Sequence, residues 1–509
     1  MCGIYAYITK NNLNVEDILN SALKIKHRGP DNTSEYILQI GEYNIYLMFH
    51  RLAINGLTET GNQPMKINDK ILICNGEIYN YQELAKNYNI DLYTGSDCEI
   101  IPYLYEKVGI EMINLLDGVF SFVLIDIEKG LLFIGHDPIG IRSLYYSINE
   151  NELGIASELK ALNNQFNNIR FYDPGMYSVF NFQNGFFNHY KYFNLNFNII
   201  HYQESEIIHN IYSLLNKAVK KRLLSDRPIC CLLSGGLDSS IITALTVKHL
   251  GKENVRTFSI GLQDSTDIIA AQKVADYLGT NHTSVILSVD EMINGIEDTI
   301  YQIESFDTTT IRASTPMYLL SRYISQNTQI KVVLSGEGSD EASGSYLYFH
   351  NAPSSYDFQE ECIRLINDVQ YFDVLRGDKT TAGTGLEIRV PFFDKEFINY
   401  YMSIDPSLKM VRNNYEKFLL RKAFENELPE DIVWRRKEGF SDGVSKMELP
   451  WYQIIENYTM NNFNMNEKDW YKEVFNKFYP NNENIIPYYW MPKWSGNLDN
   501  PSGRLIIGN

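Results

Sequence analysis

The sequence is poor in cysteine, in long apolar runs and in positive charge. No stretch of about 18 apolar residues occurs, and the start of the chain lacks the basic stretch and apolar core of a secretion signal. No cysteine lies in a CxxC pair, so neither a disulfide framework nor a zinc site of that spacing is expected. We therefore expect a reducing, cytoplasmic location and no membrane span. The six scattered cysteines are Cys2, Cys74, Cys98, Cys230, Cys231 and Cys362.

The charge is strongly acidic, with 45 basic and 63 acidic residues and a formal net charge of −18. Such a surface repels phosphate backbones, so nucleic acid is not an expected partner. Any anionic substrate must be held in a locally basic pocket. The length of 509 residues predicts two or three domains. The hydrophobic content of 44% predicts that the chain is folded.

The first 190 residues or so alternate short β-branched and aromatic runs with turns, and this pattern predicts stacked antiparallel sheets flanked by helices. The stretch Phe180–Tyr202 has no clear periodicity and is interpreted as a crossover between domains. The predicted strands are Tyr43–Leu52, Ile71–Cys74, Val119–Asp126, Leu131–Gly135 and Leu144–Ser147, and the predicted helices are Val15–Lys26, Tyr81–Lys86 and Cys98–Val108.

From about Glu206 onward, strands and helices alternate strictly, which predicts a parallel sheet with right-handed crossovers. Glycines at 251 and 279 end two of the predicted helices. The predicted strands are Pro228–Leu233, Val255–Ile260, Ser284–Val289 and Ile330–Leu334, and the predicted helices are Asp238–Leu250 and Asp267–Leu278.

The first motif that suits a binding or catalytic role is the loop Leu232–Ser240, which joins a predicted strand to a predicted helix. Its paired glycines allow a ligand to approach the backbone, and the following helix offers free N–H groups to a phosphate. The loop lacks the Lys-Ser/Thr of a Walker motif, whereas Asp238 is suited to hold Mg²⁺ beside phosphates. A simple Gly-rich turn with a capping Asp is the alternative reading.

A second acidic glycine loop, Ser335–Glu341, follows another predicted strand. The carboxyl ends of parallel strands share one edge, so both loops are expected to border the same crevice. Asp340 is predicted as a second Mg²⁺ ligand and Glu337 as a general base. Helix capping alone would account for the acids of one loop, but two such loops at one edge favour a ligand site.

The third motif is Met1-Cys2-Gly3. Removal of Met before a small residue would leave Cys2 with a thiol and a free α-amine, which are a nucleophile and a base on one residue. Polar residues downstream support this interpretation: Arg51 suits a carboxylate, Asn75-Gly76 can supply oxyanion donors, and Asp97 suits an ammonium group.

Together these motifs resemble glutamine-hydrolysing asparagine synthetase over nearly the whole chain. The early motifs and the Ser234–Ser240 loop also occur in other class II amidotransferases or ATP pyrophosphatases. The runs Phe306–Met317 and Phe440–Gly443 resemble asparagine synthetase in particular. The motifs that carry the resemblance are Cys2–Ile4, His27–Asp31, Asn75–Asn80, Ser234–Ser240, Ser335–Glu341 and Glu387–Phe392.

The resemblance implies an α/β plus α+β architecture. An αββα sandwich of the N-terminal nucleophile hydrolase type is expected over residues 1–195, with glutaminase activity. A doubly wound parallel-sheet ATP pyrophosphatase domain is expected over residues 196–509. Ammonia from glutamine would pass internally to aspartate that ATP has adenylated. The expected substrates are glutamine, aspartate and ATP, with Mg²⁺, and a homodimer is usual for such enzymes.

The resemblance also assigns roles to individual residues. Cys2 would be the nucleophile of the glutaminase, and the place of Glu337 in its loop, apart from the resemblance, makes it the expected catalytic base of the synthetase. Glutamine would be held by Arg51, Asn75, Gly76, Glu77 and Asp97. The nucleotide would be held by Leu233, Ser234, Gly235, Gly236, Asp238, Ser239, Ile260, Ser335 and Gly336, the metal by Asp238 and Asp340, and pyrophosphate by Lys379 and Lys437.

The chain departs from the family pattern at two places on the synthetase side. Ala342–Tyr346 stands where a Phe-Gly-Gly-Tyr run is usual, and Gly377-Asp378 replaces a small residue and an amide before Lys379. Three other readings stay open: another class II amidotransferase such as a β-lactam-forming cyclase, a non-catalytic relative that binds nucleotide or glutamine, and a glutaminase alone. The intact acids Asp238, Glu337 and Asp340 argue against the last two.

Overall fold

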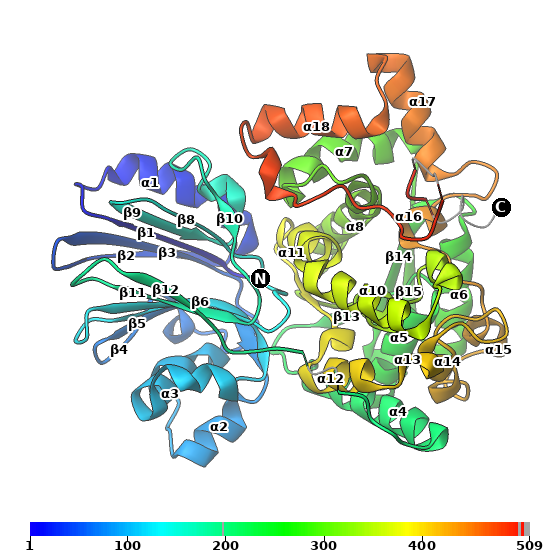
Figure 1. Cartoon of the computed structure of the whole chain (residues 1–509), viewed down its shortest axis with the longest axis horizontal. Helices are drawn as coiled ribbons and strands as arrows, with labels where there is room; N and C mark the ends of the chain where they lie inside the picture. The colour runs from blue at the N-terminus through cyan, green and yellow to red at the C-terminus, as the bar shows by residue number, and fades with distance from the viewer. Residues whose placement is uncertain (196–197, 497–499, 503–509) are drawn as a thin grey trace.

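The computed structural model describes residues 1–195, 198–496 and 500–502, and these residues form two domains that lie side by side (Figure 1). The first domain contains β1–β12 and the second contains the elements from α4 onward. The predicted boundary between residues 195 and 196 lies outside the described residues. None of the helices within the described ranges is long and apolar enough to cross a membrane.

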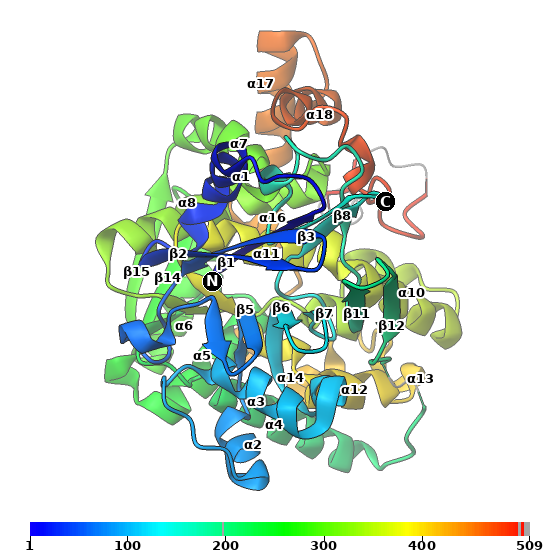
Figure 2. The ribbon, with the colours of Figure 1, turned by 90° about the vertical axis from the view of Figure 1, so that its left-hand side faces the viewer.

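The first domain contains two six-stranded antiparallel sheets that stack face to face (Figures 1 and 2). Their strand orders are β10-β8-β9-β1-β3-β2 and β12-β11-β7-β6-β5-β4. The strands are β1 Gly3–Thr9, β2 Asn32–Ile40, β3 Tyr43–Arg51, β4 Met65–Ile67, β5 Lys70–Ile78, β6 Gly118–Asp126, β7 Leu131–His136, β8 Tyr145–Ile148, β9 Glu152–Ala156, β10 Arg170–Phe171, β11 Met176–Asn181 and β12 Phe187–Lys191.

Alternation of side chains along these strands builds three layers of core. Ile4 of β1 packs between the sheets with Ile73 of β5, whereas Tyr5 points outward and packs with Ile18 of helix α1. On the other outer face, α2 and α3 cover β5 and β6. The helices are α1 Val15–Ala22, α2 Tyr81–Tyr88 and α3 Ile100–Val108. The predicted αββα sandwich is confirmed.

The second domain is built on a five-stranded parallel sheet with the order β15-β14-β13-β16-β17. Adjacent residues of β13 enter opposite core layers, because Cys230 packs in one apolar cluster and Cys231 in the other. Both faces are therefore covered, which confirms the doubly wound sheet. The strands are β13 Ile229–Leu232, β14 Arg256–Leu262, β15 Asn281–Leu287, β16 Val332–Leu334 and β17 Glu387–Arg389.

Fifteen α-helices follow the first domain within the described residues. Those that matter for the site are α5 and α9, which follow β13 and β16, together with α8 and α11. The helices are α4 Glu204–Lys221, α5 Leu237–Leu250, α6 Thr266–Leu278, α7 Val289–Ile303, α8 Thr308–Asn327, α9 Ser339–Ser343, α10 Ser355–Asp368, α11 Asp373–Ala382, α12 Lys395–Ser403, α13 Pro406–Lys409, α14 Phe418–Ala423, α15 Glu430–Val433, α16 Phe440–Gly443, α17 Trp451–Phe463 and α18 Glu467–Phe478.

Three local predictions differ from the structure. The interpretation of Phe180–Tyr202 as a crossover between domains is wrong in part, because β11 ends at Asn181 and pairs with β12 in a hairpin of the first domain. The helix predicted to Lys26 ends at Ala22 and continues as a 3₁₀-helix to Arg28. The strand predicted at Ser284–Val289 begins earlier, at Asn281, and Val289 already starts α7.

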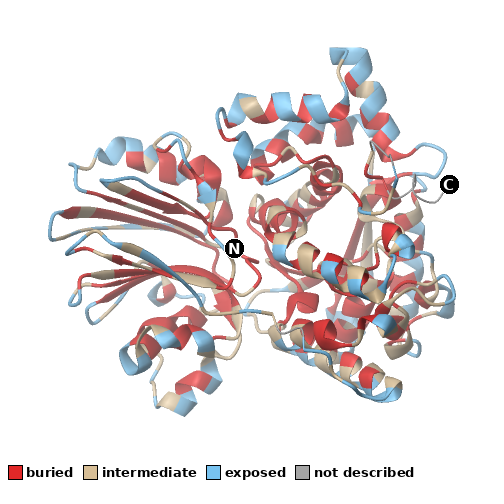
Figure 3. Ribbon diagram, in the orientation of Figure 1, coloured by how far each residue is buried: buried red, intermediate tan, exposed pale blue. Residues whose placement is uncertain are grey.

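The segments of the two domains that face each other are largely buried (Figure 3), and buried ionic contacts join them. Arg28 of the first domain is fully buried, and its guanidinium pairs with Glu158 at 2.8 Å and with Asp378 of α11 at 3.0 Å. Its Nε also donates to the carbonyl oxygen of Cys2 at 2.9 Å. The position of the first residues of the chain is thus tied to a helix of the second domain.

A second buried set lies beside the first. Glu304, which follows α7 in the second domain, accepts hydrogen bonds from the backbone N–H groups of Leu159 at 2.8 Å and Lys160 at 2.7 Å in the first domain. Its charge is balanced by the ammonium groups of Lys379 and Lys160. The side chains of Glu304, Lys379 and Lys160 are almost fully buried, so loss of one of them leaves an incompletely neutralised charge in the interior.

We predict that Lys379→Met destabilises the chain by about 3 kcal/mol, the lower end of what removal of one buried partner costs, since Lys160 still balances Glu304. Lys217→Met is the matched control, because Lys217 pairs with Glu396 at a site where both side chains are about half exposed. Its expected effect is below about 1 kcal/mol. Chemical denaturation of the two variants measures the difference, and equal losses would contradict a structural role of Lys379.

Candidate functional site

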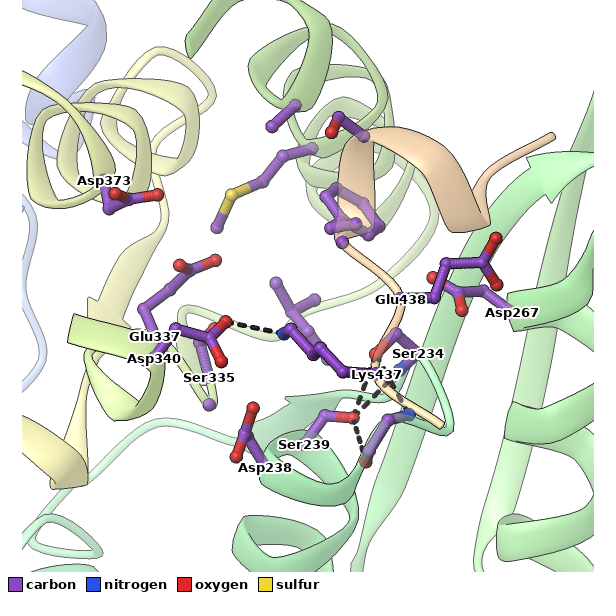
Figure 4. A pocket seen from close by; sticks show the side chains of 18 of the residues that line it. Ser234, Asp238, Ser239, Asp267, Ser335, Glu337, Asp340, Asp373, Lys437 and Glu438 are labelled. Carbon is purple, nitrogen blue, oxygen red and sulfur yellow. Dashed lines mark hydrogen bonds and ion pairs between the residues drawn. The ribbon is translucent and has the colours of Figure 1, made fainter. Parts of the chain in front are cut away.

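A deep pocket lies at the carboxyl edge of the parallel sheet, where the chain leaves β13 and β16 (Figure 4). The strand order reverses between these two strands, since β14 lies on one side of β13 and β16 on the other. Such a switch point is the usual ligand site of an open α/β sheet. The predicted residues that line it are Leu233, Ser234, Gly236, Asp238, Ser239, Ile260, Ser335, Gly336, Glu337, Asp340 and Lys437.

The two glycine loops approach each other closely at this edge. A Cβ atom on Gly336 would lie 2.8 Å from the backbone nitrogen of Ser239, so the second loop packs directly against the N-terminus of α5. Gly235 does not line the pocket; it turns the chain with a φ of +71°, where a Cβ atom would lie 2.4 Å from the backbone of Ala270. The first loop therefore depends on Gly235 for its shape, and α5 presents its N-terminus to the pocket.

Two lysines sit between the carboxylates of the loops. Lys417 Nζ lies 2.6 Å from Asp238 and 2.5 Å from Asp340, and Lys437 Nζ lies 2.6 Å from Asp340. Burial alone would raise the pKa of Asp340, but the two ammonium groups outweigh burial and hold it well below its usual range. The pKa of Lys437 is raised in turn because the carboxylates outweigh its burial. This part of an acidic protein therefore offers fixed positive charge to an anion.

The opposite part of the pocket is built on Glu337 and α11. Arg376 forms ion pairs with Glu337 and, at 2.7 Å, with Asp373. Burial raises the pKa of Glu337 although Arg376 opposes the shift, so its carboxylate accepts a proton more readily than an exposed one. Glu341 accepts a hydrogen bond from Tyr346 at 2.8 Å, while its other oxygen is buried and has no partner among the described residues.

Lys379, which was expected to bind pyrophosphate, is not among the described residues that line the pocket. Its ammonium group is fully buried at the domain interface, pairs with Glu304 and is absent from the pocket lining within the described residues. A role in pyrophosphate binding does not fit this position, because the charge is already balanced inside the interface. Lys417 lies where the second lysine was expected.

Two carboxylates are the candidate metal ligands. Asp238 and Asp340 lie close enough to share Lys417, and a pair of carboxylates completed by phosphate oxygens and water suits Mg²⁺. Elsewhere in residues 1–195, 198–496 and 500–502, no group of three or more His, Cys, Asp or Glu side chains could hold a metal ion. Any Mg²⁺ here depends on the nucleotide for its remaining ligands.

A second candidate site lies around Cys2 in the first domain. The Cys2 thiol accepts a hydrogen bond from the Leu52 N–H at 3.4 Å. Met1 is present, so the α-nitrogen of Cys2 lies in a peptide bond, and burial raises the pKa of the thiol to about 11. The Met1 amine donates to the carbonyl of Leu386 in the second domain at 3.3 Å, which places this site at the domain interface.

The polar residues predicted around Cys2 lie on β3, on β5 and in the short 3₁₀-helix Asp97–Glu99 that precedes α3. Asn75 is fully buried, and neither polar atom of its amide has a partner among the described residues. A buried unpaired amide costs about 1–3 kcal/mol, so this amide is suited to a ligand. Gly76 is required by the fold, because a Cβ atom there would lie 2.5 Å from the Val119 oxygen.

Charged groups complete this second site. Burial raises the pKa of Asp97 to about 6, and its carboxylate accepts the Ile78 N–H at 2.6 Å. Glu77 pairs with Arg389 of β17 at 3.4 Å, so it also contacts the second domain. The Arg51 guanidinium donates to the carbonyl oxygens of Gly56 and Thr58 and therefore holds the 56–62 loop.

Several residues of the pocket were not found from the sequence. Lys417 lies outside every motif and has a left-handed backbone (φ 58°) at the start of α14. Asp373 and Arg376 show the i, i+3 spacing of a helical ion pair, but this spacing does not reveal that the pair faces a pocket. Trp490 comes from the C-terminal segment and lines the pocket as well.

Comparisons with known proteins agree on both halves of the chain. The family model described as a glutamine amidotransferase domain matches residues 1–196, and the one described as asparagine synthase matches residues 210–363 and 353–497. A probable glutamine-hydrolysing asparagine synthetase of Acanthamoeba polyphaga mimivirus is 40% identical over 99% of this chain and 100% of its own length. The human glutamine-hydrolysing asparagine synthetase is 39% identical over 99% of this chain and 98% of its own.

Solved structures give weaker matches. A glutamine phosphoribosylpyrophosphate amidotransferase from B. subtilis, complexed with ADP and GMP, has a TM-score of 0.33 and 14% identity, and the match covers 56% of this chain and 81% of that one. An NH3-dependent NAD synthetase from Campylobacter jejuni has a TM-score of 0.20 and 18% identity, and the match covers 28% of this chain and 59% of that one.

We predict that Lys417→Met weakens ATP binding at least tenfold, because one ammonium group is lost and Asp238 and Asp340 then repel phosphates. Lys422→Met is the matched control, since Lys422 lies in the adjoining helix α14, has a partly exposed side chain and pairs with Glu425 at 2.7 Å. Calorimetric titration of ATP into both variants measures the effect. An unchanged affinity of Lys417→Met would contradict the assignment of this region to phosphates.

Proposed function

Because the chain belongs to the glutamine-hydrolysing asparagine synthetase family, we propose that it makes asparagine from aspartate, with ATP and with ammonia released from glutamine. The reaction releases glutamate, AMP and pyrophosphate. The observation that carries this proposal is the presence, in one chain, of the unpaired buried amide of Asn75 in the domain of Cys2 and of a pocket with two lysines at a sheet switch point. Each of the two halves of the reaction has a chemically suited site.

Glutamine hydrolysis is assigned to the first domain, residues 1–195. After removal of Met1, the Cys2 thiol gives its proton to its own α-amine and attacks the side-chain amide carbon of glutamine. The Asn75 amide and the N–H of Gly76 would stabilise the oxyanion that develops, and ammonia leaves from the tetrahedral intermediate. Water then cleaves the thioester to give glutamate. Arg51 and Asp97, with Glu77, would hold the charged end of glutamine.

Adenylation of aspartate is assigned to the second domain, residues 196–509. The loop around Ser234 and the N-terminus of α5 would hold the phosphates together with Lys417 and Lys437. A side-chain carboxylate oxygen of aspartate attacks the α-phosphorus, and pyrophosphate leaves. The product, β-aspartyl-AMP, carries AMP as a good leaving group. Its acyl group has lost the negative charge of the carboxylate, so it no longer repels the ammonia that attacks it. AMP then leaves and asparagine forms.

Mg²⁺ is proposed as a cofactor held by Asp238 and Asp340. When bound, it would offset charge on the nucleotide phosphates and on the leaving pyrophosphate. The two carboxylates provide the donor type that Mg²⁺ prefers, and Lys417 lies between them in the structure. We also propose that the enzyme works in the cytoplasm, that ammonia travels inside the protein, and that the chain forms a homodimer as family members usually do.

The two sites predict a separation of activities. Cys2→Ala removes the nucleophile and nothing in the synthetase pocket, so glutamine-dependent asparagine formation is expected to be lost while ammonium-dependent formation persists within a few-fold. Cys362→Ala, which removes a buried thiol of the second domain, is the control and should keep both activities. Quantified asparagine with each nitrogen donor is the measurement. A folded Cys2→Ala variant that loses both activities would overturn the two-site assignment.

Glu337 is proposed as the base that removes a proton after ammonia attacks the adenylate. Its raised pKa, set by burial and opposed by Arg376, suits it to accept that proton. Glu337→Gln is expected to keep exchange of labelled pyrophosphate into ATP, while asparagine formation falls by about 10²–10⁴-fold. Equal loss of exchange and of asparagine formation would show that Glu337 binds or positions the substrates instead.

A further inference from the structure

The C-terminal segment, residues 485–496 and 500–502, returns from α18 to the synthetase pocket (Figure 1). The backbone N–H of Trp490 donates to Asp307 at 3.1 Å. Farther along, Asn500 accepts a hydrogen bond from Arg312 at 2.8 Å, and Ser502 donates to Asp442 at 2.8 Å. The segment is thus held to both sequence runs that resemble asparagine synthetase in particular, Phe306–Met317 and Phe440–Gly443.

Trp490 is the residue of this segment that reaches the pocket. Its side chain is almost buried, with an exposed fraction of 9%, and its indole meets the Tyr346 ring edge to face at a centroid distance of 6.0 Å. The Tyr346 hydroxyl in turn donates to Glu341 and lies 3.4 Å from Asp373. Trp490 therefore supports the ring that orients these two carboxylates.

These contacts place Trp490 in the half of the pocket away from the phosphate-binding lysines. Asp373, which Tyr346 approaches, pairs with Arg376, and Arg376 pairs with Glu337. This half holds carboxylates and one guanidinium, the groups that suit the ammonium and carboxylate of an amino acid. The other half holds Lys417 and Lys437, which pair with Asp340 of the second glycine loop.

Trp490 also acts on the helix that borders this half. Asp307 caps the N-terminus of α8 through the Thr310 N–H at 2.9 Å, and its second oxygen is held by Trp490. Thr309 and Thr310 of the same turn line the pocket. The indole of Trp490 thus forms one wall of the pocket. The backbone of Trp490 holds Asp307 and so fixes the first turn of α8, which forms the adjoining wall.

We propose that Trp490 is a specificity-determining residue: its indole closes the acceptor end of the pocket and limits the acceptor to the length of aspartate. This inference rests on the proposed function. An acceptor with one more methylene, such as glutamate, would meet the indole or displace it. Since a single methylene is discriminated by about 10–200-fold in a well-packed pocket, removal of the wall should erase a measurable part of this discrimination.

The test compares Trp490→Ala and Trp490→Phe with Trp494→Ala. Trp494 belongs to the same segment and packs on Tyr348 and Phe349, at centroid distances of 6.1 Å and 5.8 Å, but it is not among the pocket-lining residues. The rate of AMP formation, with ammonium as nitrogen donor, is measured while the concentration of aspartate, glutamate or ATP is varied in turn. Glutaminase activity reports on the fold of the first domain.

Trp490→Ala is expected to raise the KM for aspartate by about tenfold or more and to lower the aspartate-to-glutamate ratio of kcat/KM by about tenfold or more. The KM for ATP should stay within about twofold, and Trp490→Phe should show a smaller shift in the same direction. Trp494→Ala should keep the wild-type ratio. If Trp490→Ala does not fold, the Trp490→Phe shift decides the question.

Two kinds of failure can be told apart. A wild-type chain that forms no AMP from aspartate and ATP would overturn the proposed function, and this inference with it. An active wild-type chain whose Trp490 variants keep the aspartate-to-glutamate ratio, or lose it no more than Trp494→Ala does, would overturn this inference alone.

Discussion

Buried ionic contacts between the two domains hold the remaining structure in place. Charges in a protein interior are costly unless they are paired, so Arg28 with Asp378 and Lys160 with Glu304 strongly oppose any separation of the domains. The same contacts reach the glutaminase site, because Arg28 also binds the carbonyl of Cys2. The distance and orientation between the two sites are therefore properties of the fold. This arrangement suits a reaction in which one site supplies ammonia to the other.

The pocket also depends on opposite charges that are paired with one another. A chain of net charge −18 that binds a polyanion must gather positive charge locally, and Lys417 and Lys437 do so between two carboxylates. The acids around Lys437 raise its pKa, and Lys417 pairs with both Asp238 and Asp340. On the other side, Arg376 is shared by Glu337 and Asp373, which leaves Glu337 less tightly held than Asp340. The two acids of one loop therefore differ in proton affinity.

The sequence predicted the parts of the structure that are encoded locally. Alternation of strands and helices predicted the parallel sheet, and the position of the two acidic loops after strands of that sheet predicted that they meet at one edge. Residues whose role depends on tertiary packing were not predictable in this way. Lys417 reaches the pocket through a left-handed turn, Trp490 arrives from the far end of the chain, and Lys379 is turned into the interface by the helix that carries Arg376. The hairpin of β11 and β12 was missed because β12 is mostly exposed and lacks a clear alternation of apolar and polar residues.

The central claim is that one rigid chain passes nitrogen from glutamine to aspartate. Glutamine labelled with heavy nitrogen in its side-chain amide, supplied with ATP, Mg²⁺ and aspartate in the presence of an enzyme that consumes free ammonium, tests this claim most directly. The account predicts that labelled asparagine still forms at close to the rate seen without the scavenging enzyme. Loss of labelled asparagine when free ammonium is removed would show that the two sites exchange nitrogen through solution, and would contradict the account.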